Sequence, residues 1–119
     1  MVTMIVHTTL PLEKVDVPAF VAELGTAATN AFELPPHLRS VFLYPIPPEH
    51  ATESEGYQAT FILYTAPGKT VDHRRAMVKG LHEAVTAHDW GKPVKVVVTI
   101  KEHESDYVGV NGTLRIDAV

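Results

Sequence analysis

The sequence predicts an α/β fold in which two β-α-β units form one four-stranded mixed sheet with both helices on one face. The main observation is an internal repeat, because the segment Thr3–Thr8 returns as Thr60–Thr65. The apolar face of a helix returns at the same offset, from Phe20, Val21, Leu24, Ala27 and Ala28 to Met77, Val78, Leu81, Ala84 and Val85. A third segment repeats as well, since Val41 and Leu43 correspond to Val98 and Ile100. Residues 1–56 and 57–119 are therefore predicted to be pseudo-repeats of a single domain, 1–119.

The first half begins with a predicted strand over Val2–Thr8, which is rich in β-formers and apolar enough for the middle of a sheet. Asp16 is placed to cap a helix that has Pro18 in its first turn. That helix is expected to end near Phe32, because the pair Pro35-Pro36 cannot continue it.

A second strand is expected over Leu38–Ile46, and the polar segment Glu49–Gly56 then links the two repeats. The second half repeats the order, with a strand over Tyr57–Thr65 and a helix from Val71 to about His88. Asp72 lies near the positive end of this helix.

The fourth strand, Val94–Ile100, is almost wholly β-branched, which suits a strand buried on both faces. Two helices cover only one face of a small sheet, so the other face is predicted to be an apolar interface. The tail contains Asn111-Gly112, a strong hairpin signal, and a short extra strand is expected over Thr113–Ile116. Such a strand could extend the sheet of a neighbouring molecule.

Composition narrows the possible partners. The 119 residues contain no cysteine and carry a formal net charge of −4 without a block of basic residues. This composition disfavours a nucleic-acid surface, and the start of the chain encodes neither a secretory signal nor a membrane span. We expect a cytoplasmic protein whose partners are small molecules or other protein chains.

Metal and cofactor sites are not predicted. The seven histidines include His82-Glu83, which opens like a zinc-protease motif, but Thr86 stands where the second histidine is needed. Gly68-Lys69-Thr70 imitates the end of a phosphate-binding loop without its first glycine. We expect solvated surface histidines and no bound cofactor.

Arginines are candidate anchors for a carboxylate ligand, since their planar fork matches the anion. Arg74 and Arg75 occupy consecutive helix positions, so at most one of them faces a given pocket; the alternative is that both are solvated. Tyr107 could offer its hydroxyl group to a neighbour's pocket or could be a core or interface residue.

Three stretches resemble the tautomerase superfamily, in particular its macrophage migration inhibitory factor branch. They are Met4–Pro11, Leu34-Pro35-Pro36 before Val41, and Val108-Gly109-Val110-Asn111. The resemblance spans nearly the whole chain. It implies a homotrimer in which three four-stranded sheets form a barrel, with the helices outside and the pockets between subunits.

The resemblance also locates the family's catalytic position, where a proline after the initiator methionine serves as general base. In this chain that position is Val2, and aliphatic residues replace three further pocket groups. Leu34 stands in the place of a lysine, and Val110 and Leu114 stand in the places of aromatic residues. If Met1 is removed, Val2 supplies a primary amine; if Met1 stays, the amine moves by roughly 3.5 Å.

Two functions remain open. The first is a small-molecule isomerase relative that acts on an unsaturated or enolisable oxo-acid, with weak or altered activity because proline is missing. The second is a non-catalytic trimeric binding or scaffold protein. The residues expected at the site are Val2 at the catalytic position, and Leu34, Val110, Leu114, Arg74 and Tyr107 around the substrate.

Overall fold

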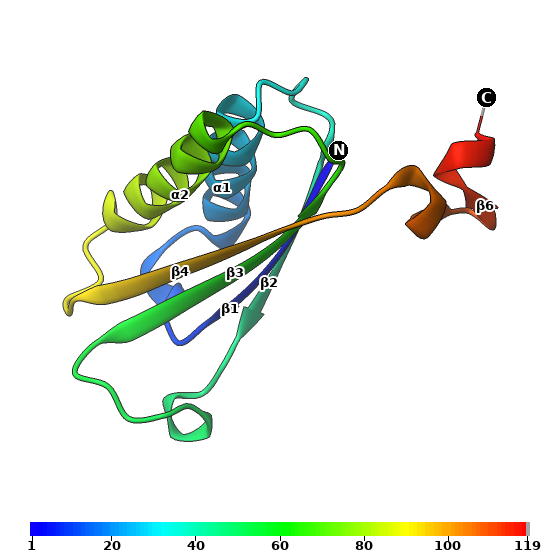
Figure 1. Cartoon of the computed structure of the whole chain (residues 1–119). Helices are drawn as coiled ribbons and strands as arrows, with labels where there is room; N and C mark the ends of the chain where they lie inside the picture. The colour runs from blue at the N-terminus through cyan, green and yellow to red at the C-terminus, as the bar shows by residue number, and fades with distance from the viewer. Residues whose placement is uncertain (119) are drawn as a thin grey trace.

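The computed structural model describes residues 1–118 and contains one four-stranded mixed sheet with two helices packed on one face (Figure 1). The strands follow the order β2-β1-β3-β4; β1 pairs antiparallel with β3, and each outer strand runs parallel to its inner neighbour. The elements are β1 (Val2–Thr8), α1 (Val17–Ala31), β2 (Arg39–Pro45), β3 (Tyr57–Thr65), α2 (Val71–Thr86) and β4 (Val94–Glu102). The predicted fold class is confirmed.

The strand register reproduces the sequence repeat. Met4 pairs with Val41 in the first unit, and Phe61 pairs with Val98 in the second. These four residues are the positions that the repeat makes equivalent. Each β-α-β unit is therefore built alike, and the antiparallel contact of β1 with β3 joins the two units.

Local capping sets the starts of the helices. Asp16 accepts a hydrogen bond from the Ala19 N–H (3.2 Å), as predicted, and Phe32 closes α1. Helix α2 begins with a capping box between Thr70 and His73, and Asp72 lies in its first turn, as predicted. Neither helix of the described residues 1–118 is long and apolar enough to cross a bilayer.

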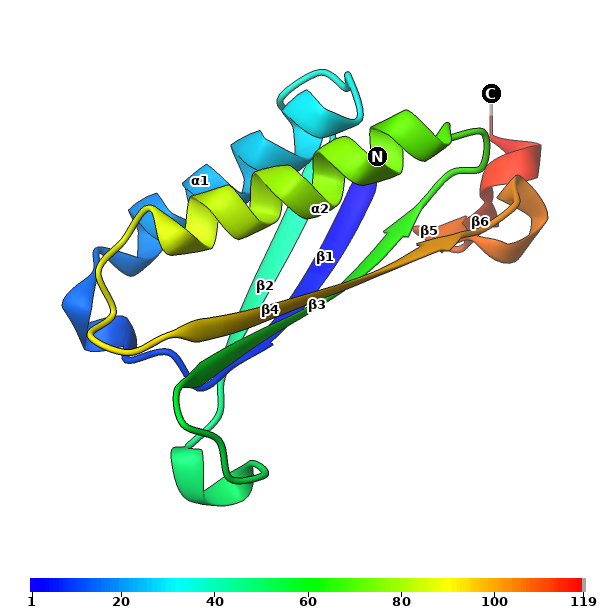
Figure 2. The same cartoon turned by 60° about the vertical axis from the view of Figure 1, so that its left-hand side comes forward.

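The core lies between the helices and the sheet face that they cover (Figure 2). Alternate residues of β1 and β3 point into it, together with the inner faces of both helices. The fully buried side chains include Val2, Met4, Val6, Phe20, Leu24, Phe61, Leu63, Met77, Leu81 and Val85. Val78 was expected on this apolar face but is exposed, because one helical step rotates it away from Met77 and Leu81.

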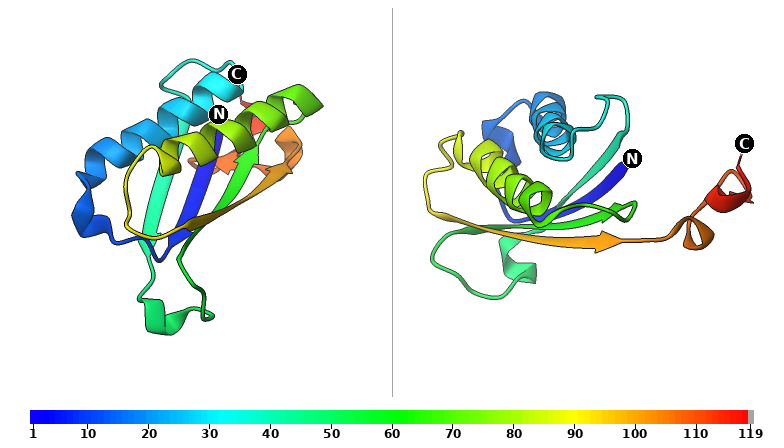
Figure 3. Two further views of the ribbon diagram at one scale, coloured as in Figure 1. Left: turned by 90° about the vertical axis from the view of Figure 1, so that its left-hand side faces the viewer. Right: turned by 45° about the horizontal axis from the view of Figure 1, so that its top comes forward.

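None of the residues 1–118 forms a layer over the opposite face of the sheet (Figure 3). Val96, Val98 and Ile100 of β4 pack against the core, whereas Val97 on the alternate side is exposed. Phe42, half exposed at 50%, lies on the same open face. The alternation follows from the pleat of the strand. The open side of β4 also exposes Lys95, Thr99 and Lys101, so the apolar side chains expected at an interface are mixed with polar and charged ones.

The tail after β4 extends beyond the sheet, and its elements pack mainly on one another (Figure 3). The predicted hairpin is confirmed as β5 (Gly109–Val110) and β6 (Thr113–Leu114), with positive φ at Asn111 and Gly112. The expected strand to Ile116 is too long, since Arg115–Asp117 form a 3-10 turn. Tyr107 and Ile116 are among its exposed apolar side chains.

We expect the protein to self-associate through the open sheet face. Light scattering should give about three times the 13.1 kDa of one chain, the number of copies that the family resemblance implies. Phe42→Glu should shift the mass towards one chain, because a carboxylate buried in an apolar contact is costly.

Val78→Glu provides the matched control, since Val78 is similarly exposed but lies on α2. A wild-type mass of one chain at micromolar concentration would contradict this expectation.

Candidate active site

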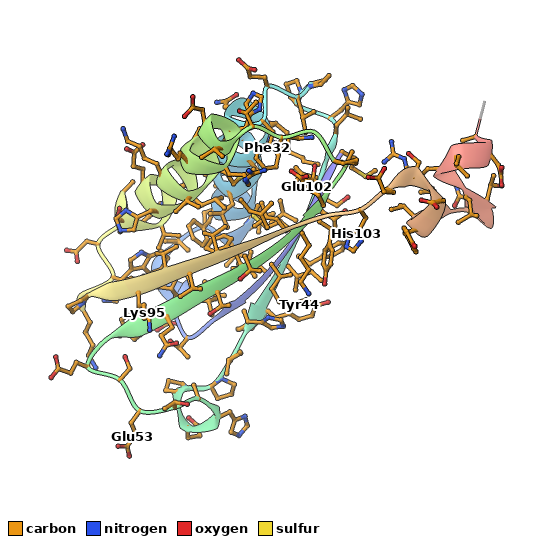
Figure 4. All side chains as sticks on the ribbon, in the orientation of Figure 1. Phe32, Tyr44, Glu53, Lys95, Glu102 and His103 are labelled. Atoms are coloured by element: carbon orange, nitrogen blue, oxygen red, sulfur yellow. The ribbon has the colours of Figure 1, made fainter. Side chains whose placement is uncertain are left out.

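A pocket of about 240 Å³ lies where the start of β1 meets the ends of β3 and β4. The antiparallel pairing places Val2 opposite Thr65, and the parallel pairing places Thr65 opposite Glu102. The tail continues beyond these strand ends (Figure 4), and residues from it complete the wall. The pocket is lined by Met1, Thr3, Tyr64, Thr65, Ala66, His103, Ser105, Val108, Gly109, Val110 and Arg115.

The first residue is held in the pocket by its backbone. The Thr65 hydroxyl group donates a hydrogen bond to the Met1 carbonyl oxygen (3.2 Å). The next backbone N–H, that of Val2, donates to the Leu38 carbonyl oxygen (3.0 Å). The amino group of Met1 is thus tied to the pocket wall by the peptide unit that follows it.

Positive charge surrounds that amino group. Partial burial lowers the pKa of the Met1 amine below its ordinary value of 8.0, and the nearby charges of Arg115 and Lys69 lower this pKa further. The Lys69 ammonium group donates to the Ala66 carbonyl oxygen (3.2 Å) and lies over the Phe32 ring. A negative group bound in the pocket would therefore meet Arg115 in the wall, with Lys69 nearby but outside the wall.

Aromatic and polar side chains complete the wall. The rings of Tyr64 and His103 stack with their centroids 5.5 Å apart. Figure 4 shows His103 at the point where the chain leaves β4 for the tail. Ser105 adds a hydroxyl group, and Val108 and Val110 add apolar surface. Such a mixture suits a small ligand with one anionic end.

A larger hollow of about 770 Å³ lies between α1 and α2. It is shallow and is lined largely by small residues such as Ala27, Ala76 and Gly80. It has no lysine or arginine in its wall. The pocket at Met1 is less open and has Arg115 in its wall, so it is the better candidate site.

The residues expected at the site are only partly brought together. Val110 lines the pocket with Met1, whereas Val2 points into the core and is 1% exposed. Leu34 packs against the core, and Leu114 lies on β6 outside the pocket. Tyr107 is 77% exposed on the tail.

Arg74 also lies outside the wall of this pocket. Its guanidinium group donates to the Lys69 carbonyl oxygen (2.7 Å) and approaches the Glu102 carboxylate (3.4 Å). Arg75 pairs with Asp72 at the surface (2.8 Å). Arg74 thus steadies the loop that carries Lys69.

Sequence analysis missed Thr3, Tyr64, His103, Ser105 and Arg115. Thr3 and Tyr64 lie on strands that the repeat predicts, but the repeat does not specify their pairing across β1 and β3. The other three residues reach the pocket through the path of the tail, which no local pattern encodes. Within residues 1–118, no group of three or more histidine, aspartate or glutamate side chains gathers to hold a metal ion.

Solved structures with the same fold are trimeric 4-OT and macrophage migration inhibitory factor proteins. An asymmetric trimer of fused 4-OT is 19% identical, over 96% of each chain, with a TM-score of 0.77. The factor from Oncomelania hupensis is 16% identical, over 94% of this chain and 95% of its own, with a TM-score of 0.76. Pt0534, inactivated by 2-oxo-3-pentynoate, is 20% identical, over 95% and 93% of the two chains, with a TM-score of 0.71.

No protein-family model matches the sequence, and no curated protein matches it. The structural neighbours nevertheless define the class of fold. The chain has the fold of the tautomerase superfamily, to which 4-OT and macrophage migration inhibitory factor belong. The resemblance in the sequence is confirmed at this level.

The Met1 amine should titrate below pH 8.0, because burial and two cations disfavour its charged form. Its neutral form should therefore react with an acylating reagent at lower pH than the amine of an unfolded peptide. Arg115→Gln should raise the midpoint of this reaction towards 8.0.

Arg75→Gln is the control, since Arg75 is bound to Asp72 away from the pocket. The rate of acylation at Met1 across a pH series, followed by mass spectrometry, measures the midpoint. A midpoint at or above that of the unfolded chain would refute the electrostatic account.

Proposed function

We propose that the protein is a tautomerase-superfamily homotrimer that binds a small unsaturated or enolisable oxo-acid and isomerises it with weak or altered activity. The observation that carries this proposal is the pocket at the chain start, which combines an amino group with Arg115. A neighbour of the same fold, Pt0534, is inactivated by a 2-oxo acid, which supports this ligand class.

The chemistry needs a base beside a carbon next to a carbonyl group. An amine with a lowered pKa holds a neutral fraction at neutral pH, so it can accept that proton. The charged fork of Arg115 suits the carboxylate, and the stacked pair Tyr64–His103 offers groups that exchange protons with the enol oxygen.

The expected weakness follows from Val2. Its side chain is buried in the core and its backbone N–H is bound to Leu38, so this position presents no secondary amine. The amine of Met1 lies one residue further out, a step of roughly 3.5 Å, which exceeds the length of a hydrogen bond. A base displaced by that distance loses most of its catalytic advantage.

The proposed trimer would bring further side chains to the same pocket. The tail carries exposed Tyr107 and Leu114 and packs mainly on itself. In a trimer, we propose, these side chains reach the pocket of a neighbouring copy, and Leu34 and Arg74 lie near its rim. The trimeric state of the fused 4-OT neighbour supports this arrangement.

The second candidate function is a trimeric binding or scaffold protein without catalysis. The burial of Val2 and the aliphatic residues at 34, 110 and 114 favour it, because base, anchor and aromatic wall have all changed. Binding without turnover separates this candidate from the first.

Phenylpyruvate should bind in the pocket and shift the amide NMR signals of Thr3, Tyr64 and Arg115. Arg115→Gln should weaken binding about tenfold, the effect of losing one charge-assisted hydrogen bond, while Arg75→Gln leaves binding unchanged. Keto-enol exchange by protein that retains Met1 should be far slower than in proline-bearing relatives.

Binding without measurable exchange would favour the scaffold function. Shifts confined to other parts of the molecule would sink the pocket assignment. Exchange as fast as in proline-bearing relatives, with Met1 confirmed present, would show that the base is misplaced in our account.

A proline at position 2 should not by itself restore activity. After removal of Met1, Val2→Pro supplies the secondary amine. The lysine that the family resemblance implies in the place of Leu34 is still missing. A misplacement of about 1 Å can cost a hundredfold in rate. We expect a gain only in Val2→Pro with Leu34→Lys.

Both variants are to be assayed on the same arylpyruvate after mass spectrometry confirms the loss of Met1. Leu34→Lys alone is the matched control, because it tests the anchor without the new base. A large gain from Val2→Pro alone would contradict the expectation that both substitutions are needed.

A further inference from the structure

The amino group at the chain start is a primary amine, whichever of Met1 or Val2 carries it. A primary amine has two replaceable hydrogens, so it can condense with a ketone to a neutral imine. We propose that the free amino group of Met1 is a nucleophile that captures small 2-oxo acids as an imine, with Arg115 holding the carboxylate group. This inference rests on the pocket of the proposed function.

The amine is activated in the manner of a nucleophilic lysine. Desolvation and neighbouring cations keep a larger share of it neutral, and the neutral amine is the reactive form. Arg115 and Lys69 are the cations, and they lie in different segments, the tail and the loop before α2. These positive charges near the Met1 amine therefore favour its neutral, nucleophilic form over its charged form.

Backbone hydrogen bonds also fix the position of the Met1 amine. The Met1 carbonyl oxygen accepts from Thr65, and the following N–H donates to Leu38, so little freedom remains beyond rotation within Met1 itself. Arg115 lines the same pocket as Met1. One molecule that carries a carboxylate next to a ketone can therefore reach both groups, and the two groups of a 2-oxo acid are adjacent.

The size of the pocket limits the ligand. About 240 Å³ is smaller than the roughly 300 Å³ at the lower end of drug-sized sites. Val108 and Val110 contribute apolar surface to its wall. A small 2-oxo acid suits this space and this polarity, and pyruvate is the smallest probe of that class.

The reaction balances without an oxidant or reductant. The amine lone pair attacks the ketone carbon, the ketone oxygen takes up a proton, and the nitrogen loses one. The hydroxyl group then leaves as water with a second proton, and the nitrogen loses its remaining hydrogen as the C=N bond forms. His103, Tyr64 and Ser105 line the pocket and are the groups available to carry these protons.

Reductive trapping tests the proposal. Protein that retains Met1 is incubated with pyruvate and cyanoborohydride, which supplies hydride to the imine. The expected product carries the mass of pyruvic acid less one oxygen atom, and peptide mapping should place it on Met1. Labelling at Met1 should outpace that of the lysine side chains in the same molecule.

Two comparisons isolate the pocket. Arg115→Gln should slow labelling by pyruvate, whose carboxylate Arg115 binds in our proposal. The loss in rate should be about tenfold greater than the loss for acetone, which has no carboxylate. Arg75→Gln should leave both rates unchanged, since that side chain is bound to Asp72. Protein unfolded in guanidinium gives the rate without a pocket. Labelling at Met1 no faster than in the unfolded chain would overturn the proposal.

The outcome is separable from that of the proposed function. Phenylpyruvate binding without trapped pyruvate at Met1 overturns the imine and leaves the pocket assignment standing. Trapping at Met1 together with phenylpyruvate binding supports both. Trapping that survives Arg115→Gln unchanged for both ketones overturns the role of Arg115 in this inference.

Discussion

The antiparallel pairing of β1 with β3 is the contact on which the rest of the molecule depends. It joins the two β-α-β units and sets Val2 opposite Thr65. Because β2 and β4 run parallel to their inner neighbours, the start of β1 and the ends of β3 and β4 meet at one edge. Both crossovers then lie on the same side of the sheet, as right-handed connections require. The pocket and the open face are two consequences of this one pairing.

The same pairing decides what the chain start can do. Side chains alternate along β1, so a residue that begins the strand on the helix side is buried, and Val2 is that residue. Its burial stabilises the core by roughly the 1.5–3 kcal/mol of a fully buried aliphatic side chain. Position 2 is thus a structural anchor in this chain. The preceding residue, Met1, lies in the pocket wall, where its carbonyl oxygen accepts a hydrogen bond from Thr65.

Strand bounds, helix caps and turns were predictable from the sequence. Contacts between residues that lie far apart in the sequence were not. The bounds of β1 and β3, the cap at Asp16 and the turn at Asn111-Gly112 follow from propensity and short-range hydrogen bonding. The exposure of Val78 required the exact rotation of α2 against the sheet. The resemblance drew attention to residues 34, 110 and 114, of which only Val110 lines the pocket. Arg115 was missed because the tail brings it to the chain start over a long sequence separation.

The imine that we propose at Met1 differs in charge from the product that a secondary amine would give. A secondary amine that condenses with a ketone gives a cation, whereas a primary amine gives a neutral imine. Beside Arg115 and Lys69 an added positive charge is disfavoured, as the lowered pKa of the Met1 amine records. The electrostatics of this pocket therefore favour the neutral product of a primary amine. The cations that weaken proton uptake by the amine are the same groups that attract a carboxylate and favour imine formation, so binding and nucleophilic capture reinforce each other in this arrangement.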